Sequence, residues 1–134
     1  MNQGLIYLDS SAILKLIVPE DESASLMSVL ADWPERISSE LARTEVLRAL
    51  RRAKVSVREF RRGEKILDRI GLIHMDRRIL LDAAMLQPPS LRTLDAIHLA
   101  TALSVRGDLA AVVTYDGRLA TAASNAKLAV WAPA

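Results

Sequence analysis

Short apolar runs alternate with segments of helical periodicity along the whole chain. Five runs have the length and composition of strands: LIYLD at 5–9, a short one around RIS at 36–38, GLIHMD at 71–76, AAVVTYD at 110–116 and LAVWA at 128–132. Between them, apolar residues recur every three or four positions, which predicts helices over 10–17, 21–31, 40–53, 57–68, a short helix ending near 86, and helices over 94–105 and 117–125. This alternation predicts an α/β fold with a parallel sheet covered by helices on both faces.

Proline, glycine and small polar residues mark the boundaries of these segments. The breakers between periodic segments are Pro19, Pro34, Pro88, Pro89, Gly107 and Gly117. We expect Ser10 to cap the helix over 10–17 and Thr93 to cap the helix over 94–105. The second cap would place Asp95 in a first helical turn.

Length and composition indicate a single domain, residues 1–134. A chain of 134 residues that is 51% hydrophobic can fill a core without further cross-links. There is no cysteine, so neither a disulfide framework nor a thiolate zinc site is available. The sequence shows no signal-peptide pattern and no apolar run of the roughly 18 residues that a membrane span needs. We therefore expect a cytoplasmic protein with no membrane partner.

Basic residues are concentrated in one part of the chain. The net charge of +2 is too small to indicate a polyanion partner by itself. Between positions 48 and 62, however, seven basic residues stand against the single acid Glu59. Such a stretch can meet phosphates, with Arg48, Arg51 and Arg52 as candidate RNA-binding residues. The alternative is that these arginines form the solvated faces of two amphipathic helices.

Four acidic residues lie where a fold normally places neutral side chains. Asp9 and Asp116 each end an apolar run, while Glu45 and Asp95 lie on the apolar faces of predicted helices. Ligands of an open parallel sheet bind beyond the carboxyl ends of its strands, so these acids are expected to converge there. Two unit charges about 4 Å apart interact by roughly 4 kcal/mol at an effective dielectric of ~20, and converging carboxylates therefore need a cation. Oxygen ligands alone suit Mg²⁺ or Mn²⁺, which predicts metal-dependent phosphodiester chemistry.

Each acid also has a purely structural explanation. Asp9 and Asp116 can cap the helices that follow them, and Asp95 can interact with the dipole of its own helix. Glu45 points along the buried stripe of its helix, where an unpaired charge is costly. The alternative partner of Glu45 is an arginine: Arg43, Arg48 or a more distant one.

Hydroxyl groups beside the acids are secondary candidates. Ser10 and Ser11 follow Asp9 and can bind a phosphate oxygen, orient a metal-bound water or cap a helix. Thr114, two residues before Asp116, points to the same side of its strand and can hydrogen-bond an acidic ligand.

Three other polar residues are further candidates for assisting the site: Glu40, Asp76 and His98. His98 follows Asp95 by one helical turn, and we expect it to be a structural histidine hydrogen-bonded to a neighbour. His74 is the only other histidine, so no histidine-rich metal site is expected.

Four sequence blocks stand out when they are taken together. They are YLDSSAILKLIVPE near the N-terminus, SSELARTEVLRALRR in the middle, LRTLDAIHLATAL late in the chain and VVTYDGRLATAA near its end. In order and spacing these blocks resemble the signature blocks of PIN-domain ribonucleases, in particular the VapC-type toxins of bacterial toxin–antitoxin pairs. The resemblance runs from about residue 5 to residue 132. A serine follows Asp9 where many relatives have threonine, which keeps the hydroxyl group.

The resemblance implies a PIN-like fold, a three-layer α/β/α sandwich around a central parallel sheet. It also implies a homodimer and a cognate antitoxin whose C-terminal segment covers the active-site groove. The residues that fall on the family's catalytic and Mg²⁺- or Mn²⁺-binding positions are Asp9, Glu45, Asp95 and Asp116, with Asp9 and Asp95 as the stronger ligands and Ser10 and Thr114 as accessory polar residues.

The expected function is that of a metal-dependent endoribonuclease, the toxin of a type II toxin–antitoxin system. A bound cation lowers the pKa of a water that a carboxylate orients or deprotonates, and it neutralises charge that builds on phosphorus. One alternative is a non-catalytic PIN-like module that binds RNA or protein. The other is a phosphoacceptor receiver domain, which requires paired acids after the first strand, whereas serines follow Asp9. A working metal site is expected to contain at least one carboxylate with a raised pKa.

Overall fold

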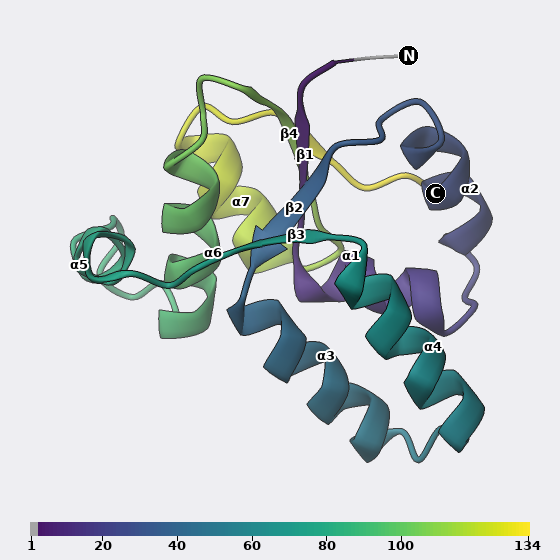
Figure 1. Cartoon of the computed structure of the whole chain (residues 1–134). Helices are drawn as coiled ribbons and strands as arrows, with labels where there is room; N and C mark the ends of the chain where they lie inside the picture. Colours follow the sequence, from purple (N-terminus) through teal and green to yellow (C-terminus); the bar gives the residue numbers. More distant parts are fainter. Residues whose placement is uncertain (1–2) are drawn as a thin grey trace.

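A five-stranded parallel sheet runs through the centre of the molecule (Figure 1). The computed structural model describes residues 3–134. In chain order the strands are β1 (Leu5–Leu8), β2 (Arg36–Ser39), β3 (Gly71–Ile73), β4 (Leu109–Val113) and β5 (Val130–Trp131). Their order in the sheet is β3-β2-β1-β4-β5, and every neighbouring pair is parallel. The predicted parallel sheet is therefore confirmed.

Between residues 3 and 134, seven helices cover the sheet on both faces, as predicted. They are α1 (Ser10–Ile17), α2 (Ser23–Leu30), α3 (Leu41–Arg52), α4 (Val57–Asp68), α5 (Arg77–Ala84), α6 (Thr93–Leu103) and α7 (Gly117–Asn125). Within the described part of the chain, no helix is long and apolar enough to cross a bilayer.

Alternation along β1 divides the core into two halves. Ile6 and Leu8 point to the face that is covered by α1, α2, α3 and α4. Tyr7 points to the opposite face and packs against α6 and α7, while α5 packs on the outer side of α6. The result is a three-layer α/β/α sandwich.

Helix boundaries follow the sequence signals closely where those signals are local. Helix α4 spans the predicted 57–68 because Ser56 and Glu59 form a complete capping box at its start.

Two predicted caps are wrong. Asp9 caps α1 by accepting a hydrogen bond from the backbone of Ala12, so Ser10 is already the first helical residue. Arg92, not Thr93, precedes α6, and its side chain makes no capping hydrogen bond.

The strands at the edges of the sheet are shorter than predicted. The run at 71–76 contributes only Gly71–Ile73, because beyond that point polar side chains form hydrogen bonds with the backbone. Glu40 accepts a hydrogen bond from the backbone of Met75 at 2.9 Å, and Asp76 caps α5. The run at 128–132 contributes only Val130–Trp131. On the interior strand β4, Val113 is the last strand residue; the Thr114 backbone still donates to Trp131, while the Thr114 side chain donates to Asp9.

The strand order creates a crevice beside β1. From β1 the chain moves to β2 on one side and later returns to β4 on the other side. Such a reversal of strand order is where open α/β sheets bind ligands, at the carboxyl ends of the strands. The residues directly after β1 and β4 lie at that position.

Candidate active site

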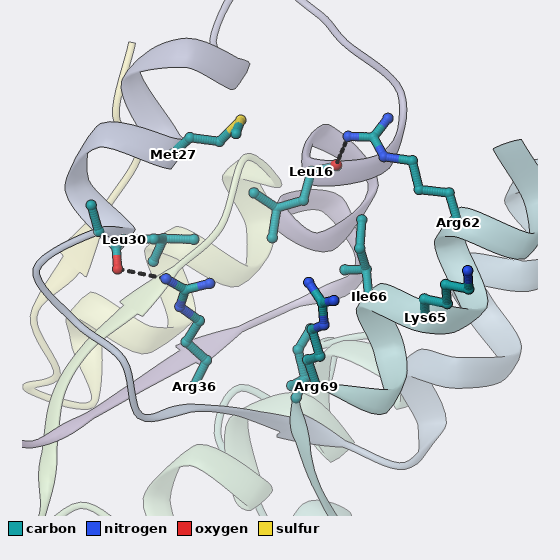
Figure 2. A pocket seen from close by; sticks show the side chains of 10 residues that line it. Leu16, Met27, Leu30, Arg36, Arg62, Lys65, Ile66 and Arg69 are labelled. Atoms are coloured by element: carbon teal, nitrogen blue, oxygen red, sulfur yellow. Dashed lines mark hydrogen bonds between the residues drawn. The ribbon is translucent and has the colours of Figure 1, made fainter.

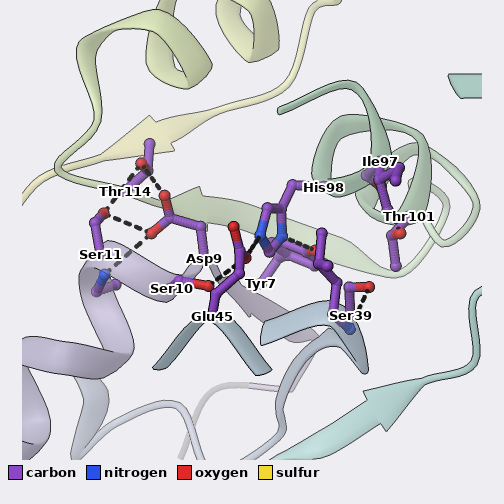
Figure 3. A network of polar contacts seen from close by, with 12 residues as sticks. Tyr7, Asp9, Ser10, Ser11, Ser39, Glu45, Ile97, His98, Thr101 and Thr114 are labelled. Carbon is purple, nitrogen blue, oxygen red and sulfur yellow. Dashed lines mark hydrogen bonds and ion pairs between the residues drawn. The ribbon is translucent and has the colours of Figure 1, made fainter. Parts of the chain in front are cut away.

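Asp9 is the most buried carboxylate of the site, with a side chain only 4% exposed. The register of β1 and β4 sets Leu8 beside Val113, so Asp9 and Thr114 leave the sheet next to each other. Oδ2 of Asp9 accepts a 2.6 Å hydrogen bond from Thr114. Oδ1 accepts hydrogen bonds from the Ser11 hydroxyl at 2.7 Å and the Ala12 backbone at 3.0 Å. Figure 3 shows Thr114 and Ser11 beside the carboxylate.

The surroundings of Asp9 disfavour its charge. Burial raises the pKa of Asp9 above its ordinary value, and the hydrogen bonds from Thr114, Ser11 and Ala12 offset only part of that effect. Among residues 3–134, the groups that donate hydrogen bonds to this buried carboxylate are all neutral.

Asp95 and Asp116 add negative charge near Asp9. Asp95 lies in the first turn of α6, as predicted, and Asp116 caps α7 by accepting from the backbone of Arg118. The pKa of Asp95 is raised, first by burial and then by the charge of Asp116, with a smaller contribution from Asp9. The charges of Asp116 and Asp9 therefore both act on Asp95.

Glu45 reaches the site from α3, where it is partly buried. Its Oε1 accepts hydrogen bonds of 2.6 Å from the Ser10 hydroxyl and 2.6 Å from Nε2 of His98. Burial acts to raise the pKa of Glu45, but the interactions with His98 and Ser10 outweigh it and bring that pKa below its ordinary value. The structural alternative of an arginine partner does not hold, because within residues 3–134 the ion-pair partner of Glu45 is His98.

Tyr7 is a participant that the sequence analysis missed. Its hydroxyl lies 2.7 Å from Nδ1 of His98, and its side chain is fully buried. Burial raises the pKa of Tyr7, so it remains a neutral phenol. Tyr7 precedes Asp9 by two residues and therefore shares its side of the strand, which is the only signal that could have suggested it. His98 itself is confirmed as a buried histidine with hydrogen-bonded neighbours.

The serines after Asp9 have separate partners. Ser10 donates to Glu45, whereas Ser11 donates to Asp9 and accepts a 2.8 Å hydrogen bond from the backbone of Tyr115. Thr114 also accepts a 3.0 Å hydrogen bond from the backbone of Asp116. The hydroxyl groups thus position the acids and connect the ends of β1 and β4.

Two predicted helpers have structural roles elsewhere. Asp76 caps α5 by accepting from the backbone of Ile79 at 2.9 Å. Glu40 lies 2.9 Å from Nδ1 of His74 and accepts from the backbone of Met75. Both contacts hold the connection between β3 and α5.

The acids of the site fit a hard divalent cation in their chemistry. Every candidate ligand is a carboxylate oxygen, with hydroxyl groups beside it, and the raised pKa values of Asp9 and Asp95 indicate negative charge that is not fully compensated. Among residues 3–134, no group of three or more histidine, aspartate or glutamate side chains is arranged so that it could hold a metal ion. Mg²⁺ usually keeps several waters and takes only one or two protein carboxylates.

The candidate RNA-binding arginines are on the surface of α3. Arg48, Arg51 and Arg52 are all exposed. Arg48 and Arg52 follow Glu45 by three and seven residues, so they continue the same face of the helix. A basic track therefore leads away from Glu45 along α3.

A second surface feature is a groove of about 480 Å³ between α1, α2 and α4 (Figure 2). Its apolar lining includes Leu16, Met27, Leu30, Ile66 and Ile70. The four charged residues that line it are all basic: Arg36, Arg62, Lys65 and Arg69.

Two of these cations stabilise the ends of helices. Arg62 donates to the carbonyl oxygens of Leu16 and Ile17 at 3.1 and 2.9 Å, at the C-terminus of α1. Arg36 donates to Leu30 at the C-terminus of α2 at 2.7 Å. The side chains of Lys65 and Arg69 have no hydrogen-bond or ion-pair partner among residues 3–134, so they offer their charge to the groove.

The sequence matches the family model for the PIN domain over residues 6–125. Two relatives from Mycobacterium tuberculosis are similar over nearly their whole length. Ribonuclease VapC46 of strain ATCC 25618 / H37Rv is 48% identical over 128 residues, which cover 96% of this chain and 97% of that protein. Ribonuclease VapC35 of strain CDC 1551 / Oshkosh is 43% identical over 133 residues, with the same coverage of 96% and 97%.

Solved structures share the fold at lower sequence identity. The M. tuberculosis toxin VapC20, described as cleaving the sarcin-ricin loop, superposes with a TM-score of 0.72 at 17% identity, covering 92% of this chain and 95% of that one. FitAcB from Neisseria gonorrhoeae superposes with a TM-score of 0.71 at 18% identity, covering 96% and 97%. A toxin–antitoxin complex from Klebsiella pneumoniae gives a TM-score of 0.66 at 22% identity, covering 83% and 86%.

Proposed function

This chain belongs to the PIN-domain family, and we propose that it is a metal-dependent endoribonuclease that acts as the toxin of a toxin–antitoxin pair. The observation that carries the proposal is the state of Asp9. It is a buried carboxylate at the carboxyl end of the central strand, its pKa is raised, and two further aspartates add their charge nearby. Two relatives, 48% and 43% identical to this chain, are named ribonucleases, and we base the proposed reaction on that name.

We assign Asp9 and Asp95 as the main ligands of Mg²⁺ or Mn²⁺, with Glu45 and Asp116 completing the site. When bound, the ion would activate a water and compensate the charge of the scissile phosphate. The protein keeps Asp9 in place through Thr114 and Ser11, which leaves the carboxylate ordered but still in need of positive charge.

Glu45 is the residue best suited to handle the attacking water. Its hydrogen bonds from His98 and Ser10 lower the pKa of Glu45, which favours the ionised form. Its Oε1 already accepts hydrogen bonds from Ser10 and His98, and among residues 3–134 no donor contacts Oε2. Oε2 is therefore the oxygen left to contact the metal ion and the water that the ion would hold.

RNA would approach along the basic face of α3. We propose that Arg48, Arg51 and Arg52 contact phosphates and that they add affinity without sequence preference.

The groove between α1, α2 and α4 is the surface that we propose for the antitoxin. Its apolar floor and its wholly basic border complement an amphipathic segment that carries acidic residues beside its apolar face. The K. pneumoniae structure with the same fold is described as a toxin–antitoxin complex, which gives this partner class a precedent.

A homodimer is the further assembly that we propose. Large apolar side chains are exposed on α5 and at the start of α6, two helices that pack on each other: Leu80 at 43%, Leu81 at 57%, Met85 at 79% and Leu94 at 49%. Sedimentation equilibrium of the wild type and of Leu81→Glu tests this directly, because a charge on this surface is expected to leave only monomer.

The experiment that tests the reaction uses the full chain purified without a partner. Structured RNA is incubated with Mg²⁺, with EDTA, and with the Asp9→Asn variant. Asp76→Asn is the matched control, because Asp76 caps a helix in the same way as Asp9 but lies outside the site. Cleavage that requires the metal and Asp9, and that survives in Asp76→Asn, supports the proposal. Full metal-dependent activity of Asp9→Asn would refute the assignment.

The competing proposal is a non-catalytic module that binds RNA or protein. It predicts that the wild type binds RNA without cutting it, with equal affinity for Asp9→Asn. The receiver-domain alternative is withdrawn, because the chain belongs to the PIN-domain family.

A further inference from the structure

A continuous hydrogen-bonded chain leads from the protein core to the candidate site (Figure 3). The hydroxyl of Tyr7 lies 2.7 Å from Nδ1 of His98, and Nε2 of the same ring lies 2.6 Å from Oε1 of Glu45. Tyr7 is 0% exposed and His98 is 3% exposed. Both ring nitrogens therefore have their partners inside the protein.

This chain joins the three elements that carry the proposed metal ligands near the sheet. Strand β1 holds Tyr7 and leads directly to Asp9. Helix α6 holds His98 one turn after Asp95. Helix α3 holds Glu45. His98 therefore contacts side chains from both of the other elements.

The direction of the hydrogen bonds favours a fixed Glu45. A neutral phenol donates its proton to Nδ1, which leaves the proton of the neutral imidazole on Nε2. The protonated ring also carries a proton on Nε2. In either form of His98, an N–H points at the carboxylate of Glu45.

The contact also determines which oxygen of Glu45 remains available. Ser10 and His98 both donate to Oε1, so two donors from different elements fix the rotation of the carboxylate. Without the ring, Glu45 would keep a single neutral donor and regain rotamers at the edge of an open site. Ordered ligands owe their orientation to such outer partners, whose loss typically costs about 10–100-fold in metal affinity.

We propose that His98, held by Tyr7, is a positioning residue that keeps Glu45 in the orientation required for metal binding. The inference rests on the proposed metal site, and it assigns His98 a role beyond packing of the core.

The test compares the wild type with His98→Leu and His98→Gln, using crystal structures grown without metal and calorimetric titration with Mn²⁺ alone. Leucine fills the space without a donor, while the amide of glutamine can replace the Nε2 donor. We expect His98→Leu to fold, to show a displaced Glu45 carboxylate and to bind Mn²⁺ about tenfold or more weakly. We expect His98→Gln to recover both the position of Glu45 and most of the affinity.

Several outcomes would overturn the inference. A folded His98→Leu chain with Glu45 in its original place, or with unchanged Mn²⁺ affinity, would show that His98 only fills the core. Equal loss in His98→Gln and His98→Leu would show the same. Should His98→Leu fail to fold, Tyr7→Phe is judged by these criteria, because it removes only the hydroxyl. A wild type that binds no Mn²⁺ refutes the metal site itself, and the position of Glu45 in the variants still decides the role of His98.

Discussion

The hydroxyl of Thr114 donates a 2.6 Å hydrogen bond to Oδ2 of Asp9, across 105 positions of sequence. The contact arises because Leu8 and Val113 are paired in the parallel register of β1 and β4. The same hydroxyl accepts a hydrogen bond from the backbone of Asp116. Thr114 therefore connects two of the proposed metal ligands at the point where both strands end.

Thr114→Val is expected to destabilise the protein, because it removes a donor to a buried carboxylate while keeping the shape of the side chain. Hydrogen bonds to charged groups contribute about 1.5–3 kcal/mol, and Thr114 is only 1% exposed. Urea denaturation measures the change in the free energy of unfolding. Thr121→Val, at an exposed position of α7, is the control, with an expected change of at most about 0.5 kcal/mol. Equal effects at the two positions would contradict the role given to Thr114.

The stability of Asp9→Asn relative to the wild type should depend on pH in a direction set by burial. Burial raises the pKa of Asp9 above its ordinary 3.8, so near that value the folded state binds more protons than the unfolded state. The free energy of unfolding of the wild type therefore falls as the pH rises through the pKa that Asp9 has in the folded state. It recovers below the pKa that Asp9 has in the unfolded state. Each unit by which the folded pKa is raised corresponds to about 1.4 kcal/mol.

We expect Asp9→Asn to be as stable as the wild type or more stable at neutral pH, and its advantage to shrink as the pH approaches 3.8. Urea unfolding of both proteins at a series of pH values measures the difference, in which the contributions of other groups such as Glu45 cancel. An advantage that grows as the pH falls would have the wrong sign and would contradict this account.

Much of the site follows from local sequence, because the acids sit next to recognisable boundaries. Asp9 and Asp116 come directly after apolar runs, and Asp95 was expected in a first helical turn, where it lies. The structural explanation for Asp9 and Asp116 also holds, since both cap helices. Capping and metal binding use the same acceptor oxygens, so the sequence alone could not separate the two roles.

The partner of Glu45 could not be predicted, because it depends on packing between distant segments. Arginines four or fewer positions away suggested an ion pair along the helix, but His98, 53 residues later, occupies that place. Likewise, β3 and β5 end early because each is an edge strand that pairs with only one neighbour. A helix cap such as Asp76 can therefore end the strand pattern sooner than the sequence predicts. Pattern analysis locates elements well, whereas contacts across layers require the assembled fold.

Mg²⁺ is expected to stabilise the wild type, because it compensates the charge of Asp9, Asp95 and Asp116. For a single site, a ligand at 100 times its Kd adds about 2.7 kcal/mol to the free energy of unfolding. Thermal unfolding with Mg²⁺ and with EDTA measures this gain. Asp95→Asn should lose most of it, whereas Asp76→Asn, at a helix cap outside the site, should keep it. A gain of the same size in Asp95→Asn would remove that residue from the ligand set.

Removing Arg48 and Arg52 together should weaken RNA binding and make it less dependent on salt. For single-stranded RNA, each phosphate contact that is lost reduces the magnitude of the slope of log association constant against log salt concentration by about 0.7. Filter binding at several salt concentrations, with the inactive Asp9→Asn background, measures both quantities. The control is Arg77→Ala/Arg78→Ala on α5, a pair of equally exposed arginines outside α3. If the control pair has the same effect, the basic face of α3 has no special role.

The groove between α1, α2 and α4 should bind an acidic amphipathic helix through Lys65 and Arg69. These two cations are free of partners among residues 3–134, whereas Arg36 and Arg62 are engaged by helix ends, so replacing the free pair should not disturb the fold. The probe is a labelled synthetic peptide in which leucines recur every three or four positions and glutamates flank them. Fluorescence anisotropy should show binding to the wild type and a loss of at least about tenfold for Lys65→Glu/Arg69→Glu, since two attractive contacts become repulsive. Arg77→Glu/Arg78→Glu carries the same charge change on α5 and should bind as the wild type does.

A scrambled peptide of the same composition separates recognition of the amphipathic face from simple charge attraction. Equal binding of the scrambled peptide, or equal loss in both double variants, would mean that net charge alone attracts the probe and that the groove selects nothing.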